Sequence, residues 1–512
     1  MEFTNKDLEL LQEKGIDQNE VKRQIETFKE GIPFVRLSKS AVVGDGILKF
    51  SPSEEQQYID TFEKSKEGLL LLKFVPASGA ASRMFKAMFN FLEAYDPLGE
   101  SLDEYVARTN DTAIKEFFEQ WEKLAFYKLI QNRIVGKAKN KDEEKYLFVK
   151  EMLLEDGLNY GFYPKGLLPF HEYGDTTATP FEEHLKEAAA YATVGGKSNL
   201  HFTISEQHGE MFNEEFNKVG DRVSTATKTS FTVGYSFQKS STDTIAVDMN
   251  NDPFRNSEGT ILFRPGGHGA LIENLDEQDA DIIFIKNIDN VVTPRYADDV
   301  SKSKKILAGL LLSVQQKAFE YARALEGDTV NSELLNDCKA FLEDELNVRF
   351  SDSFATFTIS NQIDVLKDKL HRPIRICGMV KNEGEPGGGP FWIKDGNGRI
   401  SLQIVESAQI DLSNSNQSEI LKTSTHFNPV DIVCGVKDYE GDKYNLLNYV
   451  DPKQGFITEK TKEGKALKAL ERPGLWNGAM AYWNTIFVEV PSTTFNPVKT
   501  VNDLLKPAHQ VK

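Results

Sequence analysis

The feature that most constrains the fold is a nearly continuous apolar run at residues 69–75, LLLLKFV, which follows a polar amino-terminal stretch. A run of this length without alternating polar residues is typical of a strand buried on both faces, as in parallel sheets. Pro76 ends the run, and small residues then lead into a helix that we expect to open around Arg83. A strand, a tight turn and a helix in this order form the first half of a parallel α/β unit.

Further strand and helix signals alternate along the chain. Such alternation favours a doubly wound sheet. We therefore predict an α/β fold with a mixed, mostly parallel central sheet, helices on both faces and helical insertions. The expected strands are residues 200–204, 230–237, 260–263 and 281–285, and the expected helices are 181–191, 206–218, 302–325 and 331–345.

The same patterns divide the chain into four segments. Residues 1–68 are expected to form a polar, helical amino-terminal extension. Residues 69–300 form the α/β core, which a helical insertion at 92–160 interrupts, and residues 301–370 form a helical segment. The strand-rich and glycine-rich residues 371–512 complete the core.

The overall charge limits the partners of the chain. It has 60 Lys and Arg against 78 Asp and Glu, a net charge of -18, which repels nucleic acid and anionic membranes. We expect no partner of either kind, and any phosphate must bind in a local basic pocket or through a metal. The longest apolar run is too short to cross a bilayer, and no secretory leader is evident. The distant Cys338, Cys377 and Cys434 suggest neither a disulfide framework nor a zinc site, so we expect a cytoplasmic protein.

The turn after the first strand has the properties of an anion site. A helix amino terminus points backbone N–H groups at one place and adds partial positive charge. Arg83 adds a guanidinium that can hold two phosphate oxygens at once. A plain tight turn with a surface arginine is the alternative. The small residues that let a ligand approach the backbone are Ala77, Ser78, Gly79, Ala80, Ala81 and Ser82.

Residues 75–84, VPASGAASRM, resemble the signature loop of the nucleotidyltransferases that make sugar nucleotides, Gly-x-Gly-Thr-Arg-Met. Gly79 matches its first glycine, and Ser82 stands where the family has threonine. Arg83 matches the arginine that holds the triphosphate in that family. Ala81 replaces the second glycine, a departure that puts an extra methyl group where the nucleotide packs and leaves room for a degenerate site.

The family pattern continues with a lysine before an apolar and proline-containing stretch. That lysine matches Lys165 in PKGLLPF, which stands later in the chain because the helical insertion comes before it. Lys86 is the other candidate for the same role. The resemblance implies that the lysine contacts the phosphates, while a plain surface lysine is the alternative.

The loop at residues 264–269, RPGGHG, resembles the Pro-Pro-Gly-His-Gly loop with which eukaryotic-type UDP-sugar pyrophosphorylases contact uracil. The resemblance assigns Gly267, His268 and Gly269 to nucleotide binding, and Gln238 is a weaker candidate. Glycines have no side chain, so a planar ligand can lie directly against the backbone of such a loop. An ordinary loop with an uninvolved histidine is the alternative.

A metal ligand is expected where the strand at 281–285 ends. Ligands bind at the carboxyl ends of strands in open α/β sheets, and Mg²⁺ takes oxygen ligands there. Residues 287–290, NIDN, resemble the family's Asn-x-Asp-Asn segment, which implies that Asp289 holds Mg²⁺. The alternative is an Asx-turn.

The carboxy-terminal third carries the expected sugar site. Asn382, Glu383 and Glu385, in a glycine-rich stretch, suit sugar hydroxyls, although a structural turn is equally open. Residues 393–406 resemble a UDP-sugar pyrophosphorylase segment in which Glu406 contacts the sugar. Asn484 is assigned to the same role.

The segment FNPVKT resembles the family's Pro-Val-Lys-Thr segment, so Lys499 matches its phosphate-contacting lysine. Five motifs thus occur in the family's order, over residues 69–91, 165–300 and 371–505. The chain also resembles an uncharacterised bacterial family on this fold.

The resemblance implies the reaction of a nucleoside triphosphate with a sugar 1-phosphate, giving a nucleoside-diphosphate sugar (UDP-sugar is favoured) and pyrophosphate, with Arg83, Lys165 and Lys499 acting on the phosphates. A glycosyltransferase on the same fold and a non-catalytic nucleotide-sugar-binding or scaffold protein remain open. A dehydrogenase is disfavoured because the later glycines of the dinucleotide fingerprint are missing.

Overall fold

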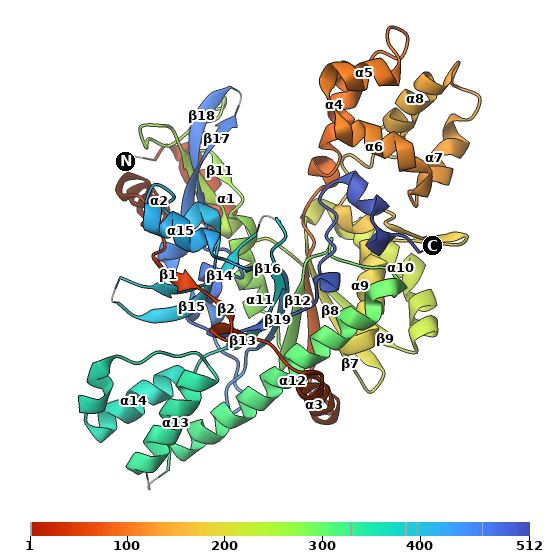
Figure 1. Cartoon of the computed structure of the whole chain (residues 1–512). Coiled ribbons are helices and arrows are strands. Elements are labelled where there is room, and N and C mark those ends of the chain that lie inside the picture. Colours follow the sequence, from red (N-terminus) through yellow and green to blue (C-terminus); the bar gives the residue numbers. More distant parts are fainter. Residues whose placement is uncertain (1–2, 328–329, 385–386, 397, 463, 512) are drawn as a thin grey trace. The chain divides into compact units, whose positions relative to one another are not determined.

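The computed structural model describes residues 3–327, 330–384, 387–396, 398–462 and 464–511. The chain divides into two compact units, each built from three separate stretches (Figure 1). The first unit comprises Met1–Phe74, Ser236–Ile285 and Lys304–Pro491, and the second comprises Val75–Tyr235, Lys286–Ser303 and Ser492–Lys512. These units do not follow the four segments expected from the sequence, because strands from both ends of the chain build one sheet.

The first unit is built on a mixed sheet with the strand order β2-β3-β19-β13-β16-β12-β4. The pairs β2–β3, β3–β19, β19–β13 and β12–β4 are parallel, and β13–β16 is antiparallel. A mostly parallel central sheet is therefore confirmed. The strands are β2 (Val42–Val43), β3 (Gly46–Leu48), β4 (Leu71–Pro76), β12 (Ile282–Lys286), β13 (Ile374–Lys381), β16 (His426–Gly435) and β19 (Asn484–Glu489).

Helices cover both faces of this sheet, as predicted. On one face, α11 (Ile272–Asp276) packs through Leu275 against alternate strand residues such as Phe74 and Ile283. On the other face, Phe62 of α3 (Pro52–Ser65) meets Phe284 with ring centroids 6.2 Å apart. The long helix α12 (Pro294–Ala324) packs beside α3 so closely that a side chain at Gly309 would overlap a carbonyl oxygen of α3.

Residues 1–68 also contain strands, so the prediction of a purely helical extension is wrong. Besides α1 (Asn5–Lys14) and α2 (Gln18–Glu30), they form β1 (Leu37–Ser40), β2 and β3. These strands have two to four residues, too few for a periodic pattern, and β1 and β3 pair with distant strands, for example Ile47 with Phe487. The expected strand at 260–263 is reduced to β11 (Phe263–Arg264).

The first unit has further small sheets and helices. One sheet has the order β1-β14-β15, and another the order β11-β10-β18-β17. Their strands are β10 (Thr244–Val247), β14 (Gly389–Lys394), β15 (Ile400–Val405), β17 (Phe456–Lys462) and β18 (Lys465–Glu471). The remaining helices are α13 (Ser332–Asp344), α14 (Ile359–Leu370) and α15 (Ser415–Lys422).

The second unit holds the turn after β4 and the helical insertion. Its strands are β5 (His171–Tyr173), β6 (Thr176–Ala178), β7 (Thr193–Val194), β8 (Lys197–Ile204) and β9 (Ser230–Phe237). Its helices are α4 (Lys86–Ala94), α5 (Leu102–Thr109), α6 (Thr112–Gln120), α7 (Tyr127–Ile134), α8 (Lys141–Leu153), α9 (Pro180–Tyr191) and α10 (Gly209–Thr227).

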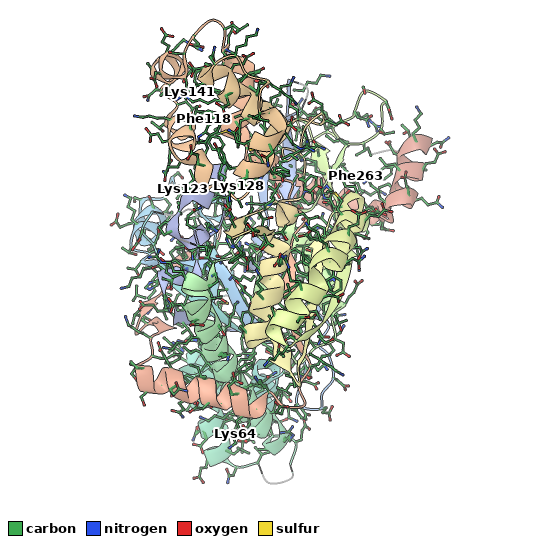
Figure 2. All side chains as sticks on the ribbon, turned by 90° about the vertical axis from the view of Figure 1, so that its right-hand side faces the viewer. Lys64, Phe118, Lys123, Lys128, Lys141 and Phe263 are labelled. Atoms are coloured by element: carbon green, nitrogen blue, oxygen red, sulfur yellow. The ribbon has the colours of Figure 1, made fainter. Side chains whose placement is uncertain are left out.

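The insertion is helical, as predicted, and has its own aromatic core. Figure 2 labels Phe118, which is buried there against Phe91 and Trp121, whereas Lys123 and Lys128 on neighbouring elements are exposed. No helix in the described ranges is long and apolar enough to span a membrane.

Candidate functional site

Three residues from distant parts of the chain meet in the second unit. The Nζ atoms of Lys165 and Lys499 lie 2.7 Å and 3.1 Å from the same carboxylate oxygen, Oδ2 of Asp289. The Asp289 side chain is 9% exposed and that of Lys165 13%, whereas that of Lys499 is 63% exposed. The side chains of Asp289 and Lys165 are thus largely buried, whereas that of Lys499 is open to solvent.

Backbone hydrogen bonds hold the three residues in place. The N–H of Ile288 donates to the carbonyl of Pro76, which ties the segment after β12 to the end of β4. The N–H of Val498 donates to the carbonyl of Asp289, and the N–H of Lys165 donates to that of Gly79. The cluster is therefore fixed to the turn that follows the first predicted strand.

The electrostatics of the cluster favour an ionised Asp289. Burial raises the pKa of this carboxyl, but the charges and hydrogen bonds of Lys165 and Lys499 lower it further, so the net shift is below the usual value. Burial lowers the pKa of Lys165, and Asp289 opposes that shift. Asp289 is a carboxylate at neutral pH and holds the two lysines side by side.

The turn at residues 77–83 leaves several backbone donors open. The N–H of Ala77 donates to Thr203, and that of Ala81 to Tyr163. Within the described chain, no hydrogen bond engages the N–H groups of the three exposed residues between them, Ser78, Gly79 and Ala80. Consecutive free N–H groups of this kind attract anions.

Arg83 lies on the 3-10 turn Ala81–Arg83, before α4, and not on the first turn of the helix as expected. It is exposed and has no ion pair among the described residues. The carbonyl of the next residue, Met84, accepts a hydrogen bond from Val501, so the segment that carries Lys499 runs beside Arg83. An exposed, unpaired guanidinium next to open N–H groups suits phosphate.

Ala81 is buried, whereas Lys86 is exposed. The Ala81 methyl group packs in the aromatic core around Phe85 and Phe91, so it does not fill the open side of the turn. Lys165 contacts Asp289, whereas Lys86 is exposed and has no ion pair in the described part of the chain.

The loop with Gly267, His268 and Gly269 lies in the first unit, where His268 stacks on Trp476 with centroids 4.3 Å apart and 13° between planes. The N–H of Leu475 donates to Nδ1 of His268. Burial lowers the pKa of His268 despite nearby carboxylates. A neutral ring that accepts at Nδ1 carries its proton on Nε2.

The glycines of this loop are needed for packing inside the protein. A side chain at Gly269 would overlap the carbonyl of Pro473, and Gly267 has a φ of +72°. The expectation that the glycines keep the backbone bare for a flat ligand is therefore wrong for Gly269, whose bare face the chain itself covers. A residue of the same chain, Trp476, also covers one face of His268.

Glu406 lies near this loop, with its Oε1 3.9 Å from Nε2 of His268 and 2.7 Å from Nδ2 of Asn477. Gly388 also borders it, since a side chain there would touch the Glu406 side chain. Glu406, His268 and Asn477 thus form one polar cluster in the first unit.

The other two expected sugar ligands do not meet. Glu383 follows the carboxyl end of β13, whereas Asn484 begins β19, which is parallel to β13 and pairs with its first residue. At about 3.3 Å per residue, β13 alone, from Ile374 to Lys381, spans on the order of 20 Å between these two positions. Asn484 donates to the carbonyl of Lys369 and lines a small pocket of about 110 Å³. Glu385 lies outside the described residues.

Asp289 has one carboxylate oxygen available as a ligand for a cation. Its second oxygen, Oδ1, has no hydrogen-bond partner among the described residues and is not sealed from solvent. Among the described residues, Asp289 belongs to no group of three or more potential metal ligands. One carboxylate together with phosphate oxygens and waters is a usual Mg²⁺ environment.

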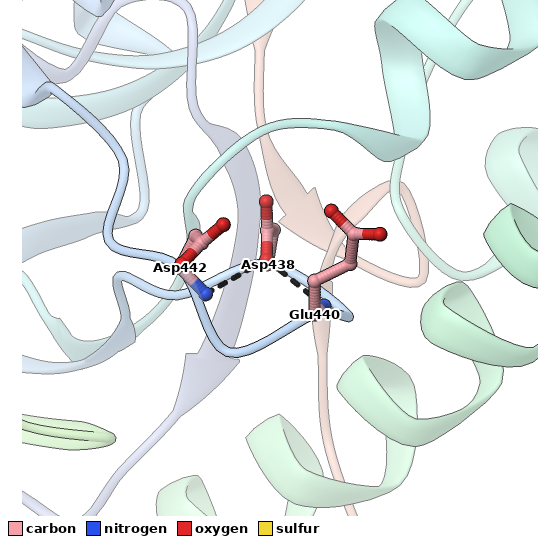
Figure 3. Close-up of side chains that lie close together, drawn as sticks. All are labelled: Asp438, Glu440 and Asp442. Carbon is pink, nitrogen blue, oxygen red and sulfur yellow. Dashed lines mark hydrogen bonds between the residues drawn. The ribbon is translucent and has the colours of Figure 1, made fainter.

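The only described group of three potential ligands is elsewhere, on a tight turn with Asp438, Glu440 and Asp442 (Figure 3). Asp438 Oδ1 accepts hydrogen bonds from the backbone N–H groups of Glu440 and Asp442. This carboxylate therefore caps its own turn, an Asx-type role that explains its position without a metal.

Sequence reasoning missed one residue that shapes the Lys499 segment. Oδ2 of Asp503 accepts hydrogen bonds from the backbone N–H groups of Lys499 and Thr500, at 2.8 Å and 2.7 Å. A Thr-x-x-Asp capping box was the available signal. Asn290, the last residue of the NIDN motif, holds the same segment through the N–H of Asn496, a contact that the motif does not indicate.

The fold and this cluster define an α/β protein with a concentrated, partly buried cationic site. The chain belongs to the family described as "Domain of unknown function (DUF4301)", whose model matches residues 4–510. A search of curated proteins gave no match.

Among solved structures, the chain is similar to the UDP-glucose pyrophosphorylase of Leishmania major, with 11% identity over 98% of this chain and 77% of that chain and a TM-score of 0.43. It is also similar to the UDP-N-acetylglucosamine pyrophosphorylase of Trypanosoma brucei in complex with an inhibitor, with 11% identity over 95% and 74% and a TM-score of 0.46.

Proposed function

We propose that the protein is a nucleotidyltransferase that joins a nucleoside triphosphate to a sugar 1-phosphate and releases pyrophosphate. The observation that carries the proposal is the contact of Lys165 and Lys499 with Asp289, fixed to a turn with open N–H groups. This arrangement concentrates positive charge in a chain whose net charge is -18.

The cluster carries more positive charge than a structural ion pair needs, and this excess suits the binding of phosphate. One lysine is sufficient to balance Asp289, so the second, largely exposed Lys499 leaves a local excess of positive charge. Arg83 adds a second unpaired cation on a neighbouring turn. Such fixed cations attract an anion in spite of the overall negative charge of the protein.

The proposed reaction needs no general base. An ionised oxygen of the sugar phosphate attacks the α-phosphorus of the triphosphate and forms a new P–O bond. The bond from the α-phosphorus to the bridging oxygen breaks, and its electron pair leaves with pyrophosphate. Catalysis then consists of alignment and charge stabilisation, for which Arg83, Lys165 and Lys499 are suited.

Mg²⁺ is part of the proposal, with Oδ1 of Asp289 as its protein ligand. When bound, the ion would neutralise phosphate charge. The residues of the chain have separate tasks. The free N–H groups of Ser78, Gly79 and Ala80 and the Arg83 guanidinium hold the triphosphate, and Lys499 contacts the reacting phosphates.

The resemblance also assigns Gly267 and His268 to the base, with uracil favoured, and Glu406 to the sugar. The neutral His268 and its stack on Trp476 are compatible with a planar ligand. The identity of the sugar stays open. Burial of the Ala81 methyl group in the core supports a catalytic protein over a non-catalytic binder.

The test is a reaction of the purified protein with each nucleoside triphosphate and a panel of sugar 1-phosphates, with and without Mg²⁺. We expect Mg²⁺-dependent pyrophosphate release. A glycosyltransferase would instead consume a sugar nucleotide and release a nucleoside diphosphate. Stabilisation by a nucleotide without turnover, in a thermal-shift measurement, would support the non-catalytic reading.

A further inference from the structure

A chain of buried hydrogen bonds ends close to the proposed phosphate site. Nδ1 of His171 lies 2.9 Å from Oε1 of Glu183, and its Nε2 lies 3.0 Å from Nδ1 of His509. Nε2 of His509 lies 3.1 Å from the carbonyl oxygen of Asn496. His171, Glu183 and His509 are all at most 3% exposed and belong to the second unit.

The partners at the two ends determine where the protons are. The Asn496 carbonyl only accepts, so His509 must donate from Nε2. Burial and the charge of His171 lower the pKa of His509 to about 3, so His509 is neutral and its Nδ1 accepts from Nε2 of His171. The Asn496 carbonyl thus sets the tautomer of His509.

The other end of the chain places an acceptor against the second nitrogen of His171. Burial raises the pKa of Glu183, but His171 and Lys186 lower it by more, so the side chain is a carboxylate. Its Oε1 already accepts a hydrogen bond from the hydroxyl of Tyr173, and it lies 2.9 Å from Nδ1 of His171. The fully buried His171 ring thus links the Glu183 carboxylate to His509.

The far end of the chain leads to Lys499. The N–H of Asn496 donates to Oδ1 of Asn290, the residue after Asp289, at 2.8 Å. Two residues farther along, the N–H of Val498 donates to the carbonyl of Asp289. The segment at 496–499 is thus held by His509 on one side and by residues 289–290 on the other.

We infer that Glu183, His171 and His509 are positioning residues that hold the carboxy-terminal segment so that Lys499 stays on Asp289. Within the described ranges, no hydrogen bond or ion pair joins any of them to Lys499 or Asp289, so they act through the backbone of residues 496–498. The catalytic consequence rests on the proposed function, whereas the structural part of the inference does not.

The protonation states are tested by nitrogen NMR of the histidine rings in the wild-type protein near neutral pH. We expect the His509 ring to show one protonated nitrogen, Nε2, which donates to the Asn496 carbonyl. The His509 signals are assigned by their loss in the variant His509→Gln. A His509 ring that carries its proton on Nδ1, and so cannot donate to that carbonyl, would overturn the inference.

The positioning is tested by amide hydrogen exchange in two variants at one site. His509→Leu removes both hydrogen bonds, whereas His509→Gln keeps one donor and one acceptor. We expect exchange of the amides of residues 496 and 498 to be at least tenfold faster in His509→Leu and close to wild type in His509→Gln. The control is His208→Gln, a buried histidine of the same unit whose Nδ1 has no partner.

Kinetics then separate this inference from the proposed function. If the enzyme turns over, kcat is expected to fall at least tenfold in His509→Leu with a much smaller change in KM, and His509→Gln is expected to restore it. If no reaction is found, NMR and hydrogen exchange still decide whether the chain positions the segment. Equal exchange in His509→Leu and the wild type would refute the positioning role.

Discussion

Replacing Lys499 with methionine separates a catalytic role from a structural one. The Lys499 side chain is 63% exposed, and Lys165 still pairs with Asp289 when the charge of Lys499 is removed. The loss of such an exposed ion pair costs about 1 kcal/mol or less of the free energy of unfolding. If Lys499 stabilises charge in the transition state, turnover is expected to fall about 100-fold, equivalent to about 2.7 kcal/mol.

The assay measures pyrophosphate release under saturating substrates together with urea unfolding of the same preparations. Lys506→Met is the matched control, because Lys506 lies on the same segment, is 68% exposed and pairs with Asp503 at 2.7 Å. It is expected to lose similarly little stability and almost no activity. Turnover of Lys499→Met within a few-fold of the control would refute the assigned role.

Three further predictions follow from the same geometry. Asp289→Asn leaves the buried Lys165 without its carboxylate, so we expect a loss of about 3–5 kcal/mol in urea unfolding, besides a fall in turnover of about 100-fold. Arg83→Ala removes an exposed side chain without an ion pair, so unfolding should change by less than about 0.5 kcal/mol, while turnover falls about 100-fold; a large loss of stability or near-normal turnover contradicts this. His509 has a pKa of about 3 in the fold against 6.5 ordinarily, so it stays neutral while the unfolded chain binds a proton. Stability should therefore fall as the pH drops from 6.5 toward 3, by at most about 5 kcal/mol, and less so in His509→Gln, as measured by unfolding at each pH.

The central strands were predictable because their burial is recorded in their composition. The run at 69–75 became β4, and the run at 281–285 became β12, with all five residues of β12 buried. The strands β1 to β3 were not predictable, because two to four residues carry no period and the partners of β1 and β3, β14 and β19, are hundreds of positions away.

The candidate site was likewise predictable from the sequence only in part. The resemblance brought Lys165, Asp289 and Lys499 to one place, and the structure joins them through one carboxylate oxygen. It does not bring Asn484 and Glu383 together, because the parallel pairing of β19 with β13 sets the end of the sheet at which a residue lies. Sequence order alone does not give that pairing.

The link between His171 and His509 had no local signal at all. The two residues are 338 positions apart, and each is unremarkable in its own segment. Only the return of the chain terminus to β5 places the rings in contact. Contacts of this kind depend on tertiary structure, which propensity and short motifs do not encode.

The most direct test of the central claim is phosphorus NMR of the purified protein with a nucleoside triphosphate, a mixture of sugar 1-phosphates and Mg²⁺. The account predicts growing signals of pyrophosphate and of a nucleoside-diphosphate sugar, both nearly absent with Lys499→Met. Spectra that stay unchanged for every triphosphate, from protein shown to be folded, would contradict it.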